Sequence, residues 1–141
     1  MKLLGIIISL CIVSLNAEEF TITCAKRYQE SDESETRQYE DLILDCGSNG
    51  KANFTISLPE KIPADGIPCI IIVGGLETGR NSLKFIPNHG QYALIAYEYP
   101  QALQSLKKIS VVKHIIFVRK AMNQVPSQLV DIMHYIQGQP W

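Results

Sequence analysis

Two adjacent glycines that follow an apolar run are the residues best placed to do chemistry in this sequence. Residues 69–73 read Cys-Ile-Ile-Ile-Val, and Gly74 and Gly75 come directly after them. Because glycine has no Cβ, the backbone can turn sharply there and lie close to a ligand. Backbone N–H groups in such a turn can donate to an anion or to a developing oxyanion. A tight strand-to-helix turn without a ligand explains the same residues, so the segment alone leaves both interpretations open.

A phosphate-binding loop is a competing function for these glycines. Gly74 and Gly79 have the glycine spacing of the GxxxxGK[ST] motif. However, Arg80 stands at the lysine position, Asn81 at the Ser/Thr position, and Glu77 would repel phosphate oxygens. The sequence also contains no GxGxxG segment and no cluster of Cys and His with metal-ligand spacing. We therefore predict neither a cofactor nor a metal.

The charge balance argues against nucleic acid as a partner. The chain has 13 Lys and Arg against 14 Asp and Glu, for a formal net charge of −1. Binding to nucleic acid depends on basic side chains that neutralise phosphates. No basic stretch with interleaved aromatic residues is present, so this class of partner is not expected.

The first 17 residues have the order of a removable secretory signal peptide. Lys2 gives a positive start, residues 3–15 are mostly apolar, and the small residue Ala17 precedes an acidic pair. The apolar run is shorter than the ~20 residues of a membrane-spanning helix, with a retained N-terminal anchor as the alternative. We expect an exported protein, periplasmic or secreted, that forms one small domain over residues 18–141 and has no membrane attachment after signal removal.

The N-terminal half of this domain is predicted to consist of antiparallel strands. Apolar and polar residues alternate over residues 20–26, 39–46 and 54–58, as in strands with one packed face and one wet face. The polar stretch 29–38 is predicted to be an exposed loop, and residues 47–50 (Gly-Ser-Asn-Gly) a turn.

The pattern then changes to that of a parallel sheet. Residues 69–73 and 92–97 are continuous apolar runs, which favours strands covered on both faces. Between them, residues 78–87 have room for a short helix with Thr78 as its N-cap. Strand, helix and strand make a βαβ unit, so the fold class is α/β, with antiparallel strands leading into a parallel sheet flanked by helices. One apolar sheet edge is left exposed in this arrangement, and we expect self-association.

The last third of the domain is predicted to be helical. Pro126 interrupts the helical pattern, which predicts either a kink or two helices. Apolar residues recur at steps of three and four at Val111, Ile115, Val118, Met122, Val125, Leu129, Ile132 or Met133, and Ile136.

This order of elements resembles the opening of an α/β-hydrolase domain, most closely the exported esterase and peptidase-like branches. The resemblance covers residues 36–141, although Val73 stands where the family often has a histidine. It implies that the glycine turn supplies one half of an oxyanion hole, with the backbone N–H groups of Gly75 and Leu76 as donors.

The resemblance also demands a nucleophile, an acid and a base. No serine in residues 1–141 lies in a Gly-x-Ser-x-Gly segment, and His89, His114 and His134 precede the place of the nucleophile. The chain is therefore expected to be the N-terminal fragment of an exported hydrolase, inactive alone, whose full-length form acts on a small-molecule ester or amide. Whether the chain itself is an enzyme stays open. The alternative is a complete small exported α/β binding or interaction domain with a structural glycine turn.

Three cysteines remain after signal removal, which suggests one disulfide and one free thiol in an oxidising compartment. Cys24 and Cys46 lie at the ends of two predicted strands and are a candidate disulfide if those strands are neighbours. Cys69 belongs to an apolar strand and is interpreted as a buried small residue.

Overall fold

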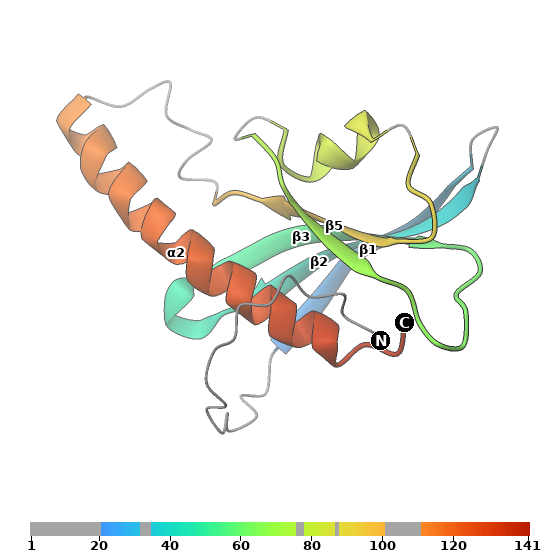
Figure 1. Cartoon of the computed structure of the whole chain (residues 1–141). Coiled ribbons are helices and arrows are strands. Elements are labelled where there is room, and N and C mark those ends of the chain that lie inside the picture. Colours follow the sequence, from blue (N-terminus) through green and yellow to red (C-terminus); the bar gives the residue numbers. More distant parts are fainter. Residues whose placement is uncertain (1–20, 32–34, 76–77, 87, 101–110) are drawn as a thin grey trace.

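The structure is a computed structural model that describes residues 21–31, 35–75, 78–86, 88–100 and 111–141 (Figure 1). The predicted signal peptide therefore lies outside the described residues. The sheet contains five strands in the order β1-β2-β3-β5-β4. The strands are β1 (Thr21–Ser31), β2 (Thr36–Asp45), β3 (Lys51–Pro59), β4 (Cys69–Val73) and β5 (Ala93–Glu98). The helices are the 3₁₀ turns η1 (Gly47–Asn49) and η2 (Gly79–Phe85) and the long helix α2 (Val111–Gln137).

The sheet is mixed. Strands β1, β2, β3 and β5 pair antiparallel with their neighbours, whereas β4 and β5 are parallel. The connection between the two parallel strands runs through η2. Antiparallel strands that lead into a parallel pair, with helices beside the sheet, confirm the predicted α/β class.

The predicted loop at residues 29–38 is wrong. Strand β1 continues to Ser31 and β2 begins at Thr36, with Gln29 opposite Gln38 and Glu30 opposite Arg37. The side chains of β1 are almost all exposed because β1 is an edge strand. Ile22 and Tyr28 pack against the two cores, but residues 29–31 at the end of β1 are all polar, so that part of the strand looked like a loop.

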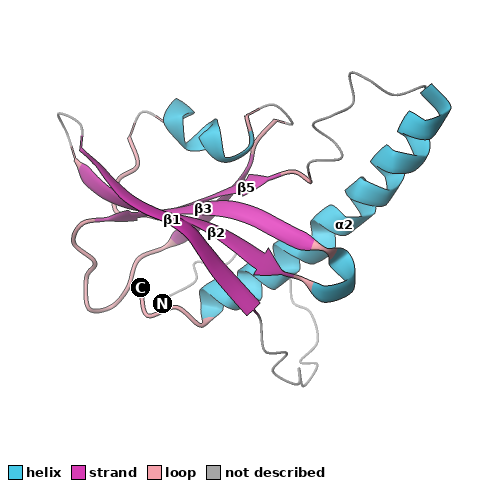
Figure 2. Ribbon diagram, turned by 180° about the vertical axis from the view of Figure 1, so that it is seen from behind, coloured by secondary structure: helices cyan, strands magenta, loops and turns pink. Residues whose placement is uncertain are grey.

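Helices η2 and α2 lie on opposite faces of the sheet (Figure 2). Strand β5 shows this directly, because Ala93, Ile95 and Tyr97 belong to the core under α2 while Leu94 and Ala96 belong to a separate core under η2. The larger core consists of Leu42, Leu44, Cys46, Ala52, Phe54, Ile56, Ile67, Ala93, Ile95, Tyr97, Val125, Ile132, Ile136 and Trp141. The smaller core consists of Tyr39, Leu83, Leu94 and Ala96.

Strand β4 is not covered on both faces, in contrast to the prediction. Ile70 is 44% exposed and Val73 is 45% exposed. By comparison, β5 is buried from Ala93 to Tyr97. Both runs are equally apolar, but β5 lies between two strands and β4 has only β5 beside it among the described strands.

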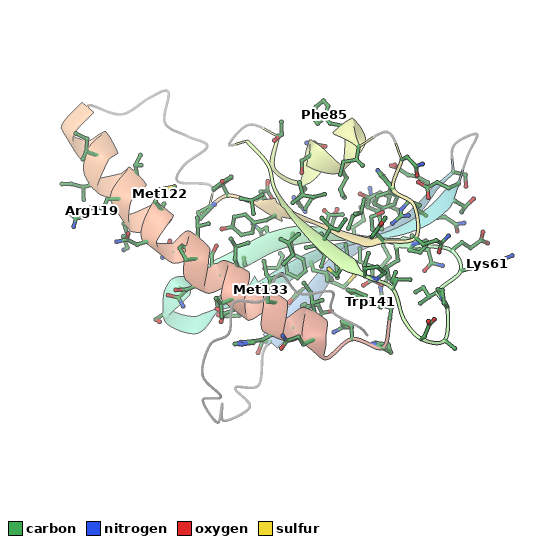
Figure 3. All side chains as sticks on the ribbon, in the orientation of Figure 1. Lys61, Phe85, Arg119, Met122, Met133 and Trp141 are labelled. Carbon is green, nitrogen blue, oxygen red and sulfur yellow. The ribbon has the colours of Figure 1, made fainter. Side chains whose placement is uncertain are left out.

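Helix α2 is continuous through Pro126, so the alternative of two helices is wrong. Its second half docks on the sheet: Gln128 accepts a 2.5 Å hydrogen bond from the Tyr97 hydroxyl and donates to the carbonyl of Asn49 at 2.7 Å. The predicted apolar stripe is buried in the second half of α2, at Val125, Ile132 and Ile136, whereas Met122 in the first half is exposed (Figure 3). No helix of the described residues is long and apolar enough to cross a membrane.

Candidate functional site

The glycine turn lies at the carboxyl end of β4, as predicted, and leads directly into η2. The carbonyl of Gly75 accepts hydrogen bonds from the amides of Thr78 and Gly79, both at 3.1 Å. The hydroxyl of Thr78 donates to the same carbonyl at 3.0 Å, so Thr78 precedes the helix without forming the predicted side-chain cap. No described residue accepts a hydrogen bond from the N–H of Gly75. Leu76, the second predicted donor, lies outside the described residues.

Packing explains the glycine at 74 but not the glycine at 75. A Cβ on Gly74 would lie 2.9 Å from Cβ of Ser82 and 2.9 Å from Oγ1 of Thr78. A Cβ on Gly75 would meet only the Thr78 hydroxyl, at 3.6 Å, which is ordinary van der Waals contact. Gly75 is also exposed. Its backbone N–H is therefore accessible, whereas Gly74 fixes the path of the chain against η2.

The described residues beside this turn do not form a nucleophile and base. Ser82 is 7% exposed, and its hydroxyl has no hydrogen-bond partner within the described part of the chain. Nε2 of His89 lies 3.1 Å from the carbonyl oxygen of Leu83 and donates to it, while Nδ1 lies 3.7 Å from a carboxylate oxygen of Glu35. These two contacts connect His89 to Leu83 of η2 and to Glu35, so the histidine has a structural role.

A polar cluster that sequence reasoning missed lies on the η2 face of the sheet. Arg80 Nε lies 2.7 Å from a carboxylate oxygen of Glu98, and Nη1 lies 3.8 Å from Asp41. Asp41 also accepts a 2.6 Å hydrogen bond from the buried hydroxyl of Thr55. The four side chains come from β2, β3, η2 and β5. Only the strand pairing brings them together, so no local spacing could have shown the cluster.

Arg37 anchors the same face. It is 2% exposed and donates five hydrogen bonds: Nε to the Ser57 hydroxyl at 2.8 Å, and the two Nη groups to Glu35 and to the carbonyls of Ser57, Gly90 and Tyr92. Because a buried guanidinium is costly unless it is paired and hydrogen-bonded, this set is structural. It fixes residues 88–92 beside the sheet.

These elements enclose a polar pocket of about 460 Å³. Two tyrosines form part of its wall: the rings of Tyr28 and Tyr39 stack at 5.1 Å, and Lys26 Nζ lies 4.4 Å from the Tyr28 centroid. Burial raises the pKa of both phenols above its ordinary value, which is itself well above 7, so both hydroxyls can donate hydrogen bonds at neutral pH. The lining residues that the structure describes are Lys26, Tyr28, Glu30, Glu35, Tyr39, Asp41, Thr55, Arg80, Asn81, Leu83, Lys84, Ile86, His89 and Glu98.

The strand register keeps the two thiols of the proposed disulfide apart. Cys24 is opposite Leu42, and Cys46 follows four residues further along the chain. At ~3.4 Å per residue this offset exceeds the ~4.4–6.8 Å between the Cα atoms of a disulfide. Cys24, Cys46 and Cys69 are free. Burial raises the pKa of Cys46 to about 12 and that of Cys69 to about 11, so both are thiols rather than reactive thiolates at neutral pH.

The chemistry of the described residues is thus that of an accessible N–H at a glycine turn and of a polar pocket next to it. Within the described ranges, no group of three or more His, Cys, Asp and Glu is placed to hold a metal ion. Comparison with protein-family models, curated proteins and solved structures found no match.

Proposed function

We propose that residues 18–141 form the N-terminal part of an α/β-hydrolase domain in an exported protein. In this proposal, residues 1–17 are the secretory signal, and the full-length protein hydrolyses a small-molecule ester or amide. The nucleophile, acid and base would come from outside residues 1–141, so that this chain alone is inactive. The observation that carries the proposal is the placement of η2 and α2 on opposite faces of the sheet.

The positions of η2 and α2 on the two faces of the sheet indicate where a further strand would lie. The connection from β4 to β5 passes over one face through η2, and α2 leaves β5 over the other face. Connections between parallel strands of one sheet are almost always right-handed. Two connections on opposite faces therefore carry the chain from strand to strand in opposite directions across the sheet. A strand that follows α2 parallel to β5 would therefore lie on the outer side of β4. The exposed apolar side chains of Ile70 and Val73 are consistent with a missing neighbour there.

The glycine turn would then lie at a topological switch point. The chain leaves β4 toward the η2 face, and the chain leaving the added strand would turn to the opposite face. Ligands in open α/β sheets bind in the crevice outside the carboxyl ends of the strands at such a point. In α/β-hydrolases the nucleophile follows one of these strands and an oxyanion donor comes from the glycine loop of the other. The accessible N–H of Gly75 supports this role, with Leu76 as the second proposed donor.

The gene sequence beyond the Trp141 codon tests the proposal. We expect an open frame that encodes an apolar strand ending in Gly-x-Ser-x-Gly, followed later by Asp and His. The longer product should react with a fluorophosphonate probe, which labels activated serines, and should be recognised by an antibody raised against residues 21–141. A stop codon followed by unrelated sequence would refute the hydrolase proposal and favour the small binding domain.

The longer product also allows a test of the oxyanion role. Gly75→Pro removes the backbone N–H, whereas Gly75→Ala keeps it and finds room for its Cβ. Loss of one oxyanion donor costs about 10²–10³-fold in kcat, so we expect that loss for Gly75→Pro and less than about a tenfold change for Gly75→Ala. Equal activity of the two variants, both folded by circular dichroism, would remove Gly75 from the site.

A further inference from the structure

The hydrolase proposal makes no use of the polar pocket between η2 and the first three strands. Figure 1 shows that η2 lies over only part of this face of the sheet. The pocket beside it has a volume of about 460 Å³, which is within the ~300–1,000 Å³ of sites that hold small molecules. Its floor includes Tyr39 and Thr55, which are buried on the central strands β2 and β3.

The lining excludes an apolar ligand. Among the lining residues that the structure describes, only Leu83 and Ile86 have no polar group on the side chain. An apolar molecule would cover the remaining polar groups without replacing their hydrogen bonds to water, and each such loss is costly. The occupant must therefore form hydrogen bonds on most of its surface.

The charges of the described lining are of both signs and nearly balanced, and several of them are already paired. Within the described ranges, the lining has four carboxylates, three cationic side chains and His89. Arg80 is paired with Glu98 and Asp41, and Glu35 is paired with Arg37. A charged ligand would have to break these pairs or lie beside charges of its own sign, whereas a neutral ligand leaves them intact.

The paired groups still have hydrogen-bonding capacity. A guanidinium has five N–H donors and a carboxylate has about four lone-pair sites, more than Arg80 and Asp41 use in the ion pairs and the Thr55 hydrogen bond described above. The side chain of Asn81 is exposed at the pocket and offers both a donor and an acceptor. A lining that mixes fixed donors and fixed acceptors matches hydroxyl groups, each of which donates and accepts.

From the size, the polar lining and the balanced charge, we infer that this pocket binds a small neutral polyhydroxylated molecule, a mono- or disaccharide. The inference does not depend on the hydrolase proposal. The described lining residues come from the η2 face of the sheet, from η2 and from the segments beside them, and Gly75 is not among them.

Titration of the ¹⁵N-labelled protein with glucose, N-acetylglucosamine and maltose, followed by amide NMR shifts, tests the inference. At least one sugar should bind with a Kd of about 1 mM or below, with shifts centred on η2 and β2. Alanylalanine and inorganic phosphate are the zwitterionic and anionic comparison probes. The sugar affinity should not change with ionic strength, since no net charge is involved.

Asn81→Ala and Asn123→Ala form a matched pair. Both asparagines are exposed, but only Asn81 lines the pocket, and its backbone N–H bonds to Thr78 whatever its side chain is. We expect Asn81→Ala to weaken sugar binding at least about fivefold, the effect of one lost hydrogen bond, and Asn123→Ala to leave it unchanged.

A second variant keeps the inference testable if Asn81→Ala does not fold. Lys84→Gln removes a lining charge but keeps a donor, and should change sugar affinity less than about threefold. No binding of any of the three sugars would overturn the inference. So would shifts centred away from η2, equal binding by the two Asn variants, or binding of phosphate or alanylalanine in preference to sugar.

Discussion

A side chain at Gly74 would meet two atoms of the η2 segment at 2.9 Å, whereas one at Gly75 would meet a single hydroxyl at 3.6 Å. Overpacking of this kind costs about 1–3 kcal/mol. We therefore expect Gly74→Ala to lower the free energy of unfolding by that amount. Gly75→Ala should stay within about 0.5 kcal/mol of the unsubstituted protein, as for surface positions.

Urea unfolding of the two single variants under the same conditions measures this difference, and the pair controls for the change from glycine to alanine. Equal destabilisation would contradict the packing explanation, since neither glycine has a positive φ. Because the two residues are identical and adjacent in the sequence, only the position of η2 distinguishes them.

Arg37 illustrates what local sequence cannot show at this scale. It lies in a polar stretch that predicts an exposed loop, yet its side chain is 2% exposed. Its carbonyl acceptors on Ser57, Gly90 and Tyr92 are 20 to 55 residues away along the chain. The pairing of β2 with β3 and of β3 with β5 brings them together, and periodicity within ten residues contains no information about those pairings.

At the scale of elements, the prediction succeeded in locating strands, which depends on the pattern within each strand. It failed for the burial of a strand, which depends on the strands beside it. The alternating pattern located β2 and β3, and the two apolar runs located β4 and β5 to within a residue or two. The same apolar pattern could not tell the central β5 from the edge strand β4, since both are rich in branched apolar residues. The polar cluster of Asp41, Thr55, Arg80 and Glu98 was missed for the related reason that it depends on strand order.

Helix α2 contains Pro126 on its exposed side without interruption. Proline has no N–H, so the carbonyl of Met122 lacks its usual partner four residues on. Proline in a helix interior is less favourable than alanine by up to about 3 kcal/mol, and no buried contact compensates at this exposed position. We expect Pro126→Ala to raise the free energy of unfolding by about 1–3 kcal/mol.

Thermal unfolding followed by circular dichroism at 222 nm measures the effect of Pro126→Ala. Met133→Ala is the control, because Met133 is also exposed on α2 and methionine and alanine both favour helix. Its melting temperature should hardly change. A lower melting temperature for Pro126→Ala would show that the proline sets the direction in which α2 crosses the sheet.

At the scale of the whole molecule, the sheet has two unlike edges. Strand β1 is polar and exposed along most of its length, whereas β4 carries a run of apolar residues with Ile70 44% and Val73 45% exposed. Apolar edge strands promote pairing with other chains, and lysine on the edge is a common protection against it. We therefore expect residues 18–141 to self-associate as concentration rises, and Ile70→Lys to suppress this association.

Sedimentation velocity over a range of concentrations tests this prediction, with Phe85→Lys as the matched control. Phe85 is 72% exposed, more than Ile70, but lies on η2 rather than on the sheet edge. If the edge drives association, Phe85→Lys should associate like the unsubstituted chain and Ile70→Lys should remain a monomer with an unchanged melting temperature. A monodisperse unsubstituted chain, or equal effects of the two lysines, would contradict the edge explanation. In the longer hydrolase that we propose, a strand would cover β4, and Ile70→Lys should there destabilise the fold by burying a charge.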